Sequence, residues 1–146
     1  MVPTTAAPTP PIDPDAYYLI ENMGVGSCLS YWEASAGPGT CATPGDTDGW
    51  RYYTPQPGDP FELINRFGGY CLGEQSVKGG VPDVAICSGA PGQQWRRGYV
   101  GSNGGSFVNV ESGLCLAATG SVSSGTIELE SCNKQLNEVW QNSGMI

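Results

Sequence analysis

Carboxylates are the residues of this chain that could do acid–base chemistry, because the 146 residues include no histidine. Without histidine, neither a Ser-His-Asp nor a Cys-His arrangement can form. Glu128 and Glu130 stand two positions apart in the segment TIELE, so strand alternation places both on one face. Two acids on one strand face are more often a solvated surface than a glycosidase-like pair. We therefore expect a protein with no enzymatic activity and no cofactor.

The cysteines and aspartates offer little to a metal ion. The six cysteines include no CxxC pair and the chain has no histidine, so we expect no zinc site. The segment DTDG at 46–49 has the start of a calcium loop but lacks the remaining ligands, which indicates a turn. Six cysteines in a small glycine-rich chain instead predict disulfides, and hence a secreted, extracellular protein. No hydrophobic secretion signal follows Met1, so this chain would be the mature form.

Charge and hydropathy restrict the partners. The formal net charge is −8, whereas binding to nucleic acid or to an anionic membrane surface needs clustered lysine and arginine. No apolar run approaches the length needed to span a bilayer. With 22 glycines and 12 prolines, the chain is a poor helix former. These counts favour a single domain of short strands that binds neither nucleic acid nor the membrane core.

The elements that position any site come from a threefold internal repeat. The tryptophans Trp50, Trp95 and Trp140 are spaced 45 and 45 residues apart, and the cysteines Cys28, Cys71 and Cys115 are spaced 43 and 44 apart. Each of these cysteines precedes a leucine and follows a glycine by two positions and an asparagine by six. Self-similarity at this period is the mark of a repeat architecture. We place the repeats at about 17–58, 59–103 and 104–146.

Each repeat predicts about four short strands, because apolar or alternating runs are bounded by glycine, proline, serine and asparagine. Three four-stranded units are too few for a propeller, which has about 4–8 blades. They can close as a barrel with pseudo-threefold symmetry, capped by hairpins. Large aromatic residues at equivalent positions would then meet near the axis, so we expect Trp50, Trp95 and Trp140 in the core.

The stretch NRFGGYCLGE…VAICSGAPGQQW resembles the ricin B-type lectin repeat, which is also found in family 13 carbohydrate-binding modules. The resemblance covers 17–142 and implies an all-β fold, the β-trefoil. Six cysteines allow 15 pairings, and the repeat selects the one within units: Cys28–Cys41, Cys71–Cys87 and Cys115–Cys132. Residues 1–16, rich in proline and threonine, are expected to form a disordered or extended tail.

The resemblance also implies degenerate sugar sites. A sugar-binding repeat of that family has an aspartate two residues after the first cysteine, an aromatic residue two before the second, and an asparagine three before the tryptophan. Here the aspartate position holds Ser30, Gly73 and Ala117. The aromatic position holds Gly39, Ala85 and Glu130, and the asparagine position holds Thr47, Gly92 and Asn137. Asn137 alone keeps the family residue, and a fold without its site does not establish the function.

Two functions from different classes remain open. The first is carbohydrate binding at an atypical site, which would use Asn137, Glu128 and Glu130, or alternatively Tyr31 and Trp32. The second is a protein-interaction adaptor or subunit of a secreted assembly, such as a toxin. Its partner would be a secreted protein, contacted by the trefoil surface and by the tail, unless that tail is only a linker or a processed N-terminus.

Overall fold

The computed structural model describes residues 13, 15–42, 45–54, 60–73, 80–101, 104–121 and 124–145. Within these ranges the chain forms twelve strands, all in one sheet, and three one-turn 3₁₀ helices. Most of the expected N-terminal tail, residues 1–12 and 14, lies outside the described residues. In the described part, no helix has the length and hydropathy needed to cross a bilayer.

Every repeat contributes four strands, with a 3₁₀ turn before the last. The first contains β1 (Tyr18–Asn22), β2 (Cys28–Trp32), β3 (Ser35–Gly39), η1 (Asp46–Asp48) and β4 (Trp50–Tyr53). The second contains β5 (Glu62–Asn65), β6 (Cys71–Leu72), β7 (Val84–Ala85), η2 (Pro91–Gln93) and β8 (Trp95–Gly101). The third contains β9 (Gly104–Asn109), β10 (Cys115–Thr119), β11 (Thr126–Glu130), η3 (Leu136–Glu138) and β12 (Trp140–Met145).

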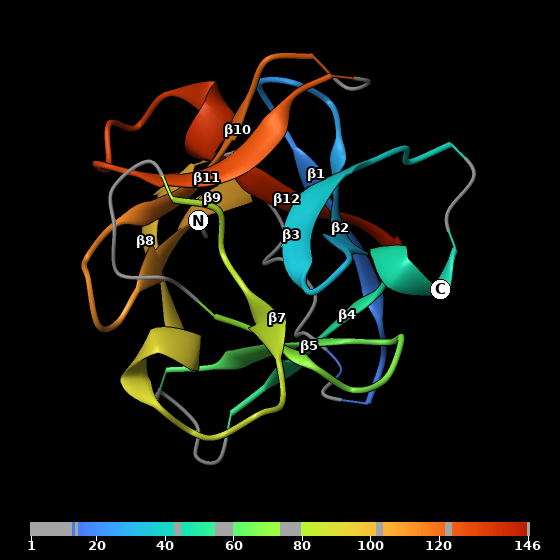
Figure 1. Cartoon of the computed structure of the whole chain (residues 1–146). Coiled ribbons are helices and arrows are strands. Elements are labelled where there is room, and N and C mark those ends of the chain that lie inside the picture. The colour runs from blue at the N-terminus through green and yellow to red at the C-terminus, as the bar shows by residue number, and fades with distance from the viewer. Residues whose placement is uncertain are drawn as a thin grey trace, which may run out of the picture.

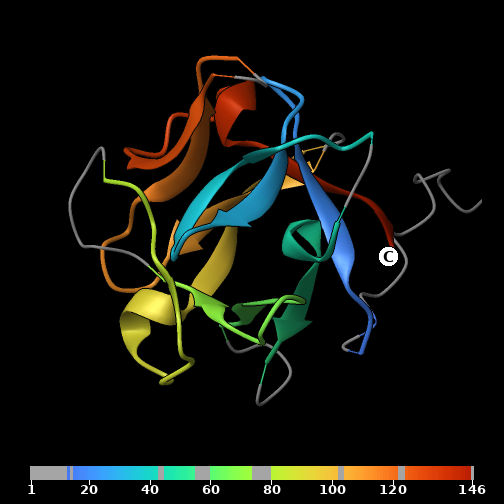
Figure 2. The same cartoon turned by 45° about the vertical axis from the view of Figure 1, so that its right-hand side comes forward.

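The barrel closes because the last strand of each repeat pairs with the first strand of the next. The antiparallel pairs are β4 with β5, β8 with β9, and β12 with β1. The third pair joins the two ends of the chain, and β1 and β12 lie side by side in both views (Figures 1 and 2). The hairpins β2–β3, β6–β7 and β10–β11 complete the three units. This architecture is a β-trefoil, as the sequence predicts.

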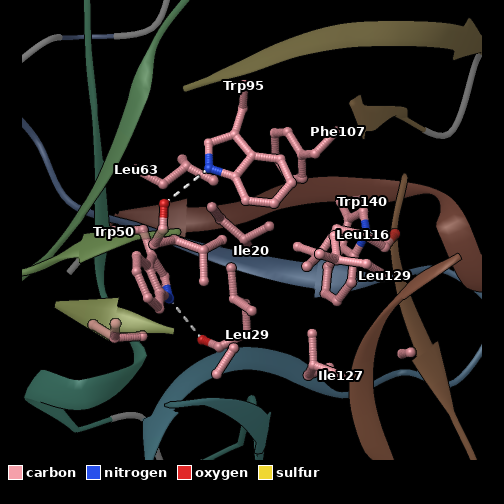
Figure 3. Close-up of a cluster of buried hydrophobic side chains, with 14 of the residues drawn as sticks. Ile20, Leu29, Trp50, Leu63, Trp95, Phe107, Leu116, Ile127, Leu129 and Trp140 are labelled. Atoms are coloured by element: carbon pink, nitrogen blue, oxygen red, sulfur yellow. Dashed lines mark hydrogen bonds between the residues drawn. The ribbon is translucent and has the colours of Figure 1, made fainter. Parts of the chain in front are cut away.

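The repeated tryptophans form the centre of the core. Trp50, Trp95 and Trp140 are fully buried. The indole nitrogen of each donates a hydrogen bond, 2.8 to 3.0 Å long, to the carbonyl oxygen of the leucine that follows the first cysteine of its own repeat. Figure 3 shows the bond from Trp50 to Leu29 and the packing of Trp140 beside Leu116. The polar atom of each ring is therefore satisfied inside an apolar cluster.

The repeated asparagines join one repeat to the next. Asn65 and Asn109 each donate a side-chain hydrogen bond to a carbonyl oxygen of the 3₁₀ turn of the preceding repeat, and Asn22 does the same to the turn of the third repeat. The side-chain oxygen of each asparagine accepts hydrogen bonds from backbone N–H groups of the turn that follows its own strand. These buried amides explain why an asparagine recurs six residues before each first cysteine.

The three disulfides lie within the repeats. Cys28 bonds to Cys41, Cys71 to Cys87, and Cys115 to Cys132, with separations of 13, 16 and 17 residues. Each ties the second strand of its unit to the loop before the 3₁₀ turn. On the chain-entropy model, a loop of this length is worth about 3 kcal/mol.

Candidate binding site

A cleft of about 520 Å³ lies where the three hairpins meet, between β3 of the first repeat and β11 of the third. Figure 1 looks onto this end of the molecule, where β3, β7 and β11 come together. We call this space the cap cleft. It is lined by Trp32, the stretch 36–40, Val81 and the stretch 125–127. All three repeats therefore contribute to it.

Trp32 is the large exposed side chain of the cap cleft, with 58% of its surface accessible. It ends β2, opposite Ser35 in β3. A Cβ on Gly37 would come within 2.7 Å of the indole, so the absence of a side chain at position 37 lets the ring lie against β3. Glycine therefore positions this tryptophan without covering it.

The hairpin that carries Trp32 is held by the second repeat. Its two-residue turn has positive φ angles at Glu33 (44°) and Ala34 (69°), a conformation that suits a tight hairpin but is uncommon outside glycine. The segment around Pro82 supports this turn: the Ala36 N–H donates to the Pro82 carbonyl, and the Val84 N–H donates to the Ala34 carbonyl. Figure 2 shows the hairpin, coloured blue to cyan, lying over one end of the barrel. The hairpin that carries Trp32 is therefore tied to the second repeat by two backbone hydrogen bonds.

Most of the cap cleft is apolar. Ala36 and Pro38 line it from β3, Val81 from the second repeat, and Ile127 from β11. Ile127 is fully buried and belongs to the main core, so the base of the cleft is the core itself. The described lining residues carry no charge.

Two residues of the lining, Thr40 and Thr126, carry a hydroxyl. Thr126 donates to the Glu128 carboxylate at 2.6 Å and lies 2.7 Å from the Thr119 hydroxyl. Because Thr126 donates its proton to Glu128, Thr119 is the donor of the second bond, and the Thr126 hydroxyl lies on the strand face opposite Ile127. Thr40 accepts from the Ala42 N–H at 3.2 Å.

The structure separates the residues that the sequence singled out for sugar binding. Trp32 lines the cap cleft, and Glu128 is linked to it through Thr126. Tyr31 points to the other face of β2, where its ring contacts Phe67 and Tyr70 edge-on with both centroids at 5.8 Å. Among the described residues, the lining of the cleft includes neither Tyr31 nor the two remaining candidates, Glu130 and Asn137.

Asn137 and Glu130 lie elsewhere in the third repeat, in η3 and at the end of β11. Asn137 lies in η3, and its backbone carbonyl accepts the Asn22 side-chain hydrogen bond. Next to it, Glu138 is 1% exposed, and its Oε1 accepts the Asn133 N–H at 2.8 Å. Burial, opposed by the Asn133 hydrogen bond and reinforced by the charge of Glu130, raises the pKa of Glu138. The family's aspartate position here is Ala117, which is fully buried and has no polar side-chain atom.

The groups of possible metal ligands among the described residues each combine one glutamate with two cysteines. Glu62 lies beside Cys71 and Cys87, and Glu138 lies beside Cys115 and Cys132. Both cysteine pairs are disulfides, and a metal would need the free thiolate. These groups therefore do not have the chemistry of a metal centre.

Sequence reasoning missed Gly37, Val81 and Thr126. Thr126 could have been found, because it shares a strand face with Glu128 in the alternating segment TIELE. Gly37 carries no signal, since its role depends on the adjacent strand. Val81 reaches the cleft only through barrel closure, which brings the second repeat against β3 and β11.

Comparison with solved structures identifies the class of fold. The designed threefold symmetric protein ThreeFoil is 24% identical, and the match covers 87% of this chain and 97% of that one with a TM-score of 0.78. The Polyporus squamosus lectin, bound to a human-type influenza-binding epitope, is 14% identical over 90% of this chain and 49% of its own, with a TM-score of 0.77. The Haemophilus ducreyi cytolethal distending toxin is 16% identical over 94% and 89%, with a TM-score of 0.74.

These likenesses establish the β-trefoil fold of ricin B-type lectins for the chain. No protein-family model and no curated protein sequence matches it. The chain spans about half the length of the Polyporus lectin.

Proposed function

We propose that this chain is a secreted, non-catalytic carbohydrate-binding protein whose ligand occupies the cap cleft. One observation carries the proposal: Trp32 is held against β3 with more than half of its surface exposed, beside a cleft lined mostly by apolar residues. Sugar rings stack their C–H faces on such aromatic surfaces and are oriented by a few polar groups.

The size and charge of the cleft fit this ligand. A volume of about 520 Å³ lies within the range of small-molecule sites, about 300–1,000 Å³, and could hold one or two sugar rings. The uncharged lining suits a neutral ligand, and the net charge of −8 disfavours an anionic one. The lectin among the similar structures supports the function at the level of the fold alone. Three disulfides support secretion.

The test is a glycan panel measured with two matched variants. Trp32→Ala removes the stacking surface, and Phe67→Ala removes another exposed aromatic ring (52% accessible) outside the cleft. We expect Trp32→Ala to weaken binding of every bound glycan at least about tenfold, which corresponds to 1.4 kcal/mol. Phe67→Ala should leave affinity unchanged. Equal affinity in the wild type and in Trp32→Ala would contradict the proposal.

A second variant tests whether the position of the ring matters. Gly37→Ala keeps Trp32 but places a methyl group where the indole now lies. Its backbone is not in the left-handed region, so the change displaces the ring without straining the chain. Glycan affinity should fall while the thermal unfolding midpoint changes little.

A protein-interaction role is the second candidate. It is favoured by the match to the Haemophilus ducreyi toxin, which covers most of both chains, and by Phe67 and Ile86, exposed apolar side chains of the second repeat. The partner would be a secreted protein, contacted by this surface and by the tail at 1–16. Deletion of residues 2–15 should leave thermal stability nearly unchanged and reduce partner capture from the source organism's secretions. Unchanged capture would move the interface onto the trefoil.

A further inference from the structure

Three aromatic rings between the first two repeats form a surface that fits a segment of the chain itself. These rings belong to Tyr31, Phe67 and Tyr70, and we call them the aromatic surface. We infer that the proline-rich segment 2–12 docks on the aromatic surface, so that segment and rings form one contact face for a partner. The inference goes beyond carbohydrate binding, because none of the three residues lines the cap cleft.

The aromatic surface combines one exposed ring with two rings that the core holds in place. The Tyr31 ring contacts Phe67 and Tyr70 edge-on, with both centroid distances at 5.8 Å. Phe67 is 52% exposed, whereas Tyr31 and Tyr70 are partly buried and pack against the main hydrophobic core. A ligand that covers Phe67 would therefore remove apolar area from water without having to order the rings first.

The turn between β5 and β6 fixes the position of Phe67 and Tyr70. The Phe67 N–H donates to the side-chain oxygen of the buried Asn65 at 2.9 Å. Gly68 has a φ of 77°, and a Cβ at this position would come within 2.6 Å of the Tyr70 ring. Glycine therefore serves two needs at position 68, the left-handed backbone and the close approach of Tyr70.

The N-terminal segment joins the described part of the chain near this surface. The Tyr17 ring lies 6.0 Å from the guanidinium carbon of Arg66, the residue before Phe67. The Ala16 N–H donates to the Asp13 carbonyl at 3.2 Å, and a bond of this spacing closes a turn that reverses the chain. An extended segment of eleven residues reaches about 34 Å, which is about the diameter of a small domain. The aromatic surface is thus within reach of segment 2–12.

The composition of segment 2–12 suits aromatic rings. It contains Pro3, Pro8, Pro10 and Pro11 and no charged side chain. Proline has no N–H, so it can lie on an apolar ring without burying an unpaired donor. Its fixed φ reduces the conformational entropy lost on docking, and proline-rich segments dock on aromatic surfaces in this way. Because the segment is tethered, an affinity in the millimolar range is enough.

The first experiment measures nuclear Overhauser effects in the full chain labelled with ¹³C-proline. We expect contacts between the proline rings at 8–11 and the rings of Phe67 and Tyr31. Tail prolines with random-coil shifts and no such contacts would overturn the inference. A mixture of labelled and unlabelled chains separates contacts within one chain from contacts between chains. Contacts found only between chains would place the segment on a second copy and overturn docking within the chain.

The second experiment adds a synthetic peptide of residues 2–12 to the chain that lacks them. We expect saturable, millimolar binding that shifts the NMR signals of the aromatic surface. Phe67→Ala should weaken this binding at least about threefold, because it removes the exposed ring. Leu136→Ala is the matched control, since Leu136 has a similar exposed fraction (53%) but lies in η3. Unfolding midpoints check that each variant is folded.

A changed peptide tests the chemistry of the segment. Replacing Pro8, Pro10 and Pro11 by alanine adds backbone N–H groups and conformational freedom, so its affinity should fall at least about threefold. Equal affinity of the two peptides, or equal affinity of the wild-type surface and Phe67→Ala, would overturn the inference. Glycan binding should be the same with and without residues 2–12. A failure of tail docking would therefore leave the proposed carbohydrate function intact.

Discussion

In repeats 2 and 3, the side chain two residues before the tryptophan hydrogen-bonds to the loop after the second cysteine, but the residue type differs. We call this side chain, Gln93 in repeat 2 and Glu138 in repeat 3, the brace. In repeat 2, Gln93 accepts the Ser88 N–H at 2.7 Å and donates to the Ile86 carbonyl at 2.9 Å. In repeat 3, Glu138 accepts the equivalent N–H, that of Asn133, but has a second oxygen where Gln93 has an amino group. Among the described residues, this Oε2 has no hydrogen-bond partner although it is buried.

The difference shows that the fold conserves the shape of the brace more strictly than its chemistry. A glutamate fills the space of a glutamine, but a carboxylate cannot donate a hydrogen bond. Only the protonated acid would restore the donor, which agrees with the raised pKa of Glu138. Repeat 1 varies further, because Asp48 stands at this position and accepts the Gly45 N–H at 2.7 Å. The comparison of Gln93 with Glu138 can be sharpened by four changes.

The largest expected effect is on the tryptophans, where the two repeats should behave alike. Trp95 and Trp140 are equally buried and make equivalent indole hydrogen bonds. Each change to alanine should reduce the free energy of unfolding by about 3–5 kcal/mol, through lost burial and a cavity. Denaturant unfolding followed by fluorescence measures this. A much larger loss in one repeat would show that the repeats differ in the core as well as in the brace.

The next effect is stabilisation by Glu138→Gln. The amide would supply the missing donor and remove a buried carboxylate, so the free energy of unfolding at pH 7 should rise by about 1–3 kcal/mol. Asp48→Asn is the control, because the Asp48 Oδ2 already has a hydrogen-bond partner. No gain in Glu138→Gln would mean that the Oε2 is satisfied in solution.

The same substitution should change the pH dependence. The folded pKa of Glu138 is raised above its ordinary value of 4.5, so the native state binds its proton more tightly than the unfolded state does. The resulting stability is fully present below pH 4.5 and is lost as the pH rises through the raised pKa. The advantage of Glu138→Gln should therefore be small in acid and grow toward neutral pH. Burial also raises the pKa of Glu62, and subtracting the two unfolding curves removes its contribution.

The converse variant, Gln93→Glu, should make repeat 2 resemble repeat 3. It replaces the donor to the Ile86 carbonyl with an oxygen. Because Gln93 is only half-buried, the loss should be near the lower end for such groups, about 1 kcal/mol at pH 7. Gln93→Met is the control for loss of the amide without a charge. A loss equal to the gain in Glu138→Gln would mean that exposure does not matter at this position.

The fold could be predicted from the sequence because the residues that identify it recur at a regular spacing. Trp50, Trp95 and Trp140 recur at a fixed spacing, and the cysteine pairing follows from the same register. Strand alternation also separates Tyr31 from Trp32, since neighbouring side chains point to opposite faces. A pattern that occurs three times in the sequence can be recognised without knowing how the repeats pack against one another.

The cap cleft could not be predicted in the same way, because no single repeat contains it. Trp32, Val81 and Thr126 come from three different repeats and meet only when the barrel closes. The role of Gly37 depends on the ring beside it, not on its own conformation. Positions that differ between repeats, such as Glu138, carry no periodic signal and need coordinates to be interpreted.

The smallest expected effect is that of Asn137→Ala on glycan binding, which should be none. Asn137 is the family-like residue of repeat 3, but Ala117 and Glu130 stand where its partners would be, and the described lining of the cap cleft does not include it. Its structural bond, from the Asn22 side chain, ends on the backbone carbonyl and survives the substitution. Titration with simple galactosides and with the best ligand of the panel measures the effect. Millimolar or tighter galactoside binding that disappears in Asn137→Ala would place the sugar site in the third repeat and remove it from the cap cleft.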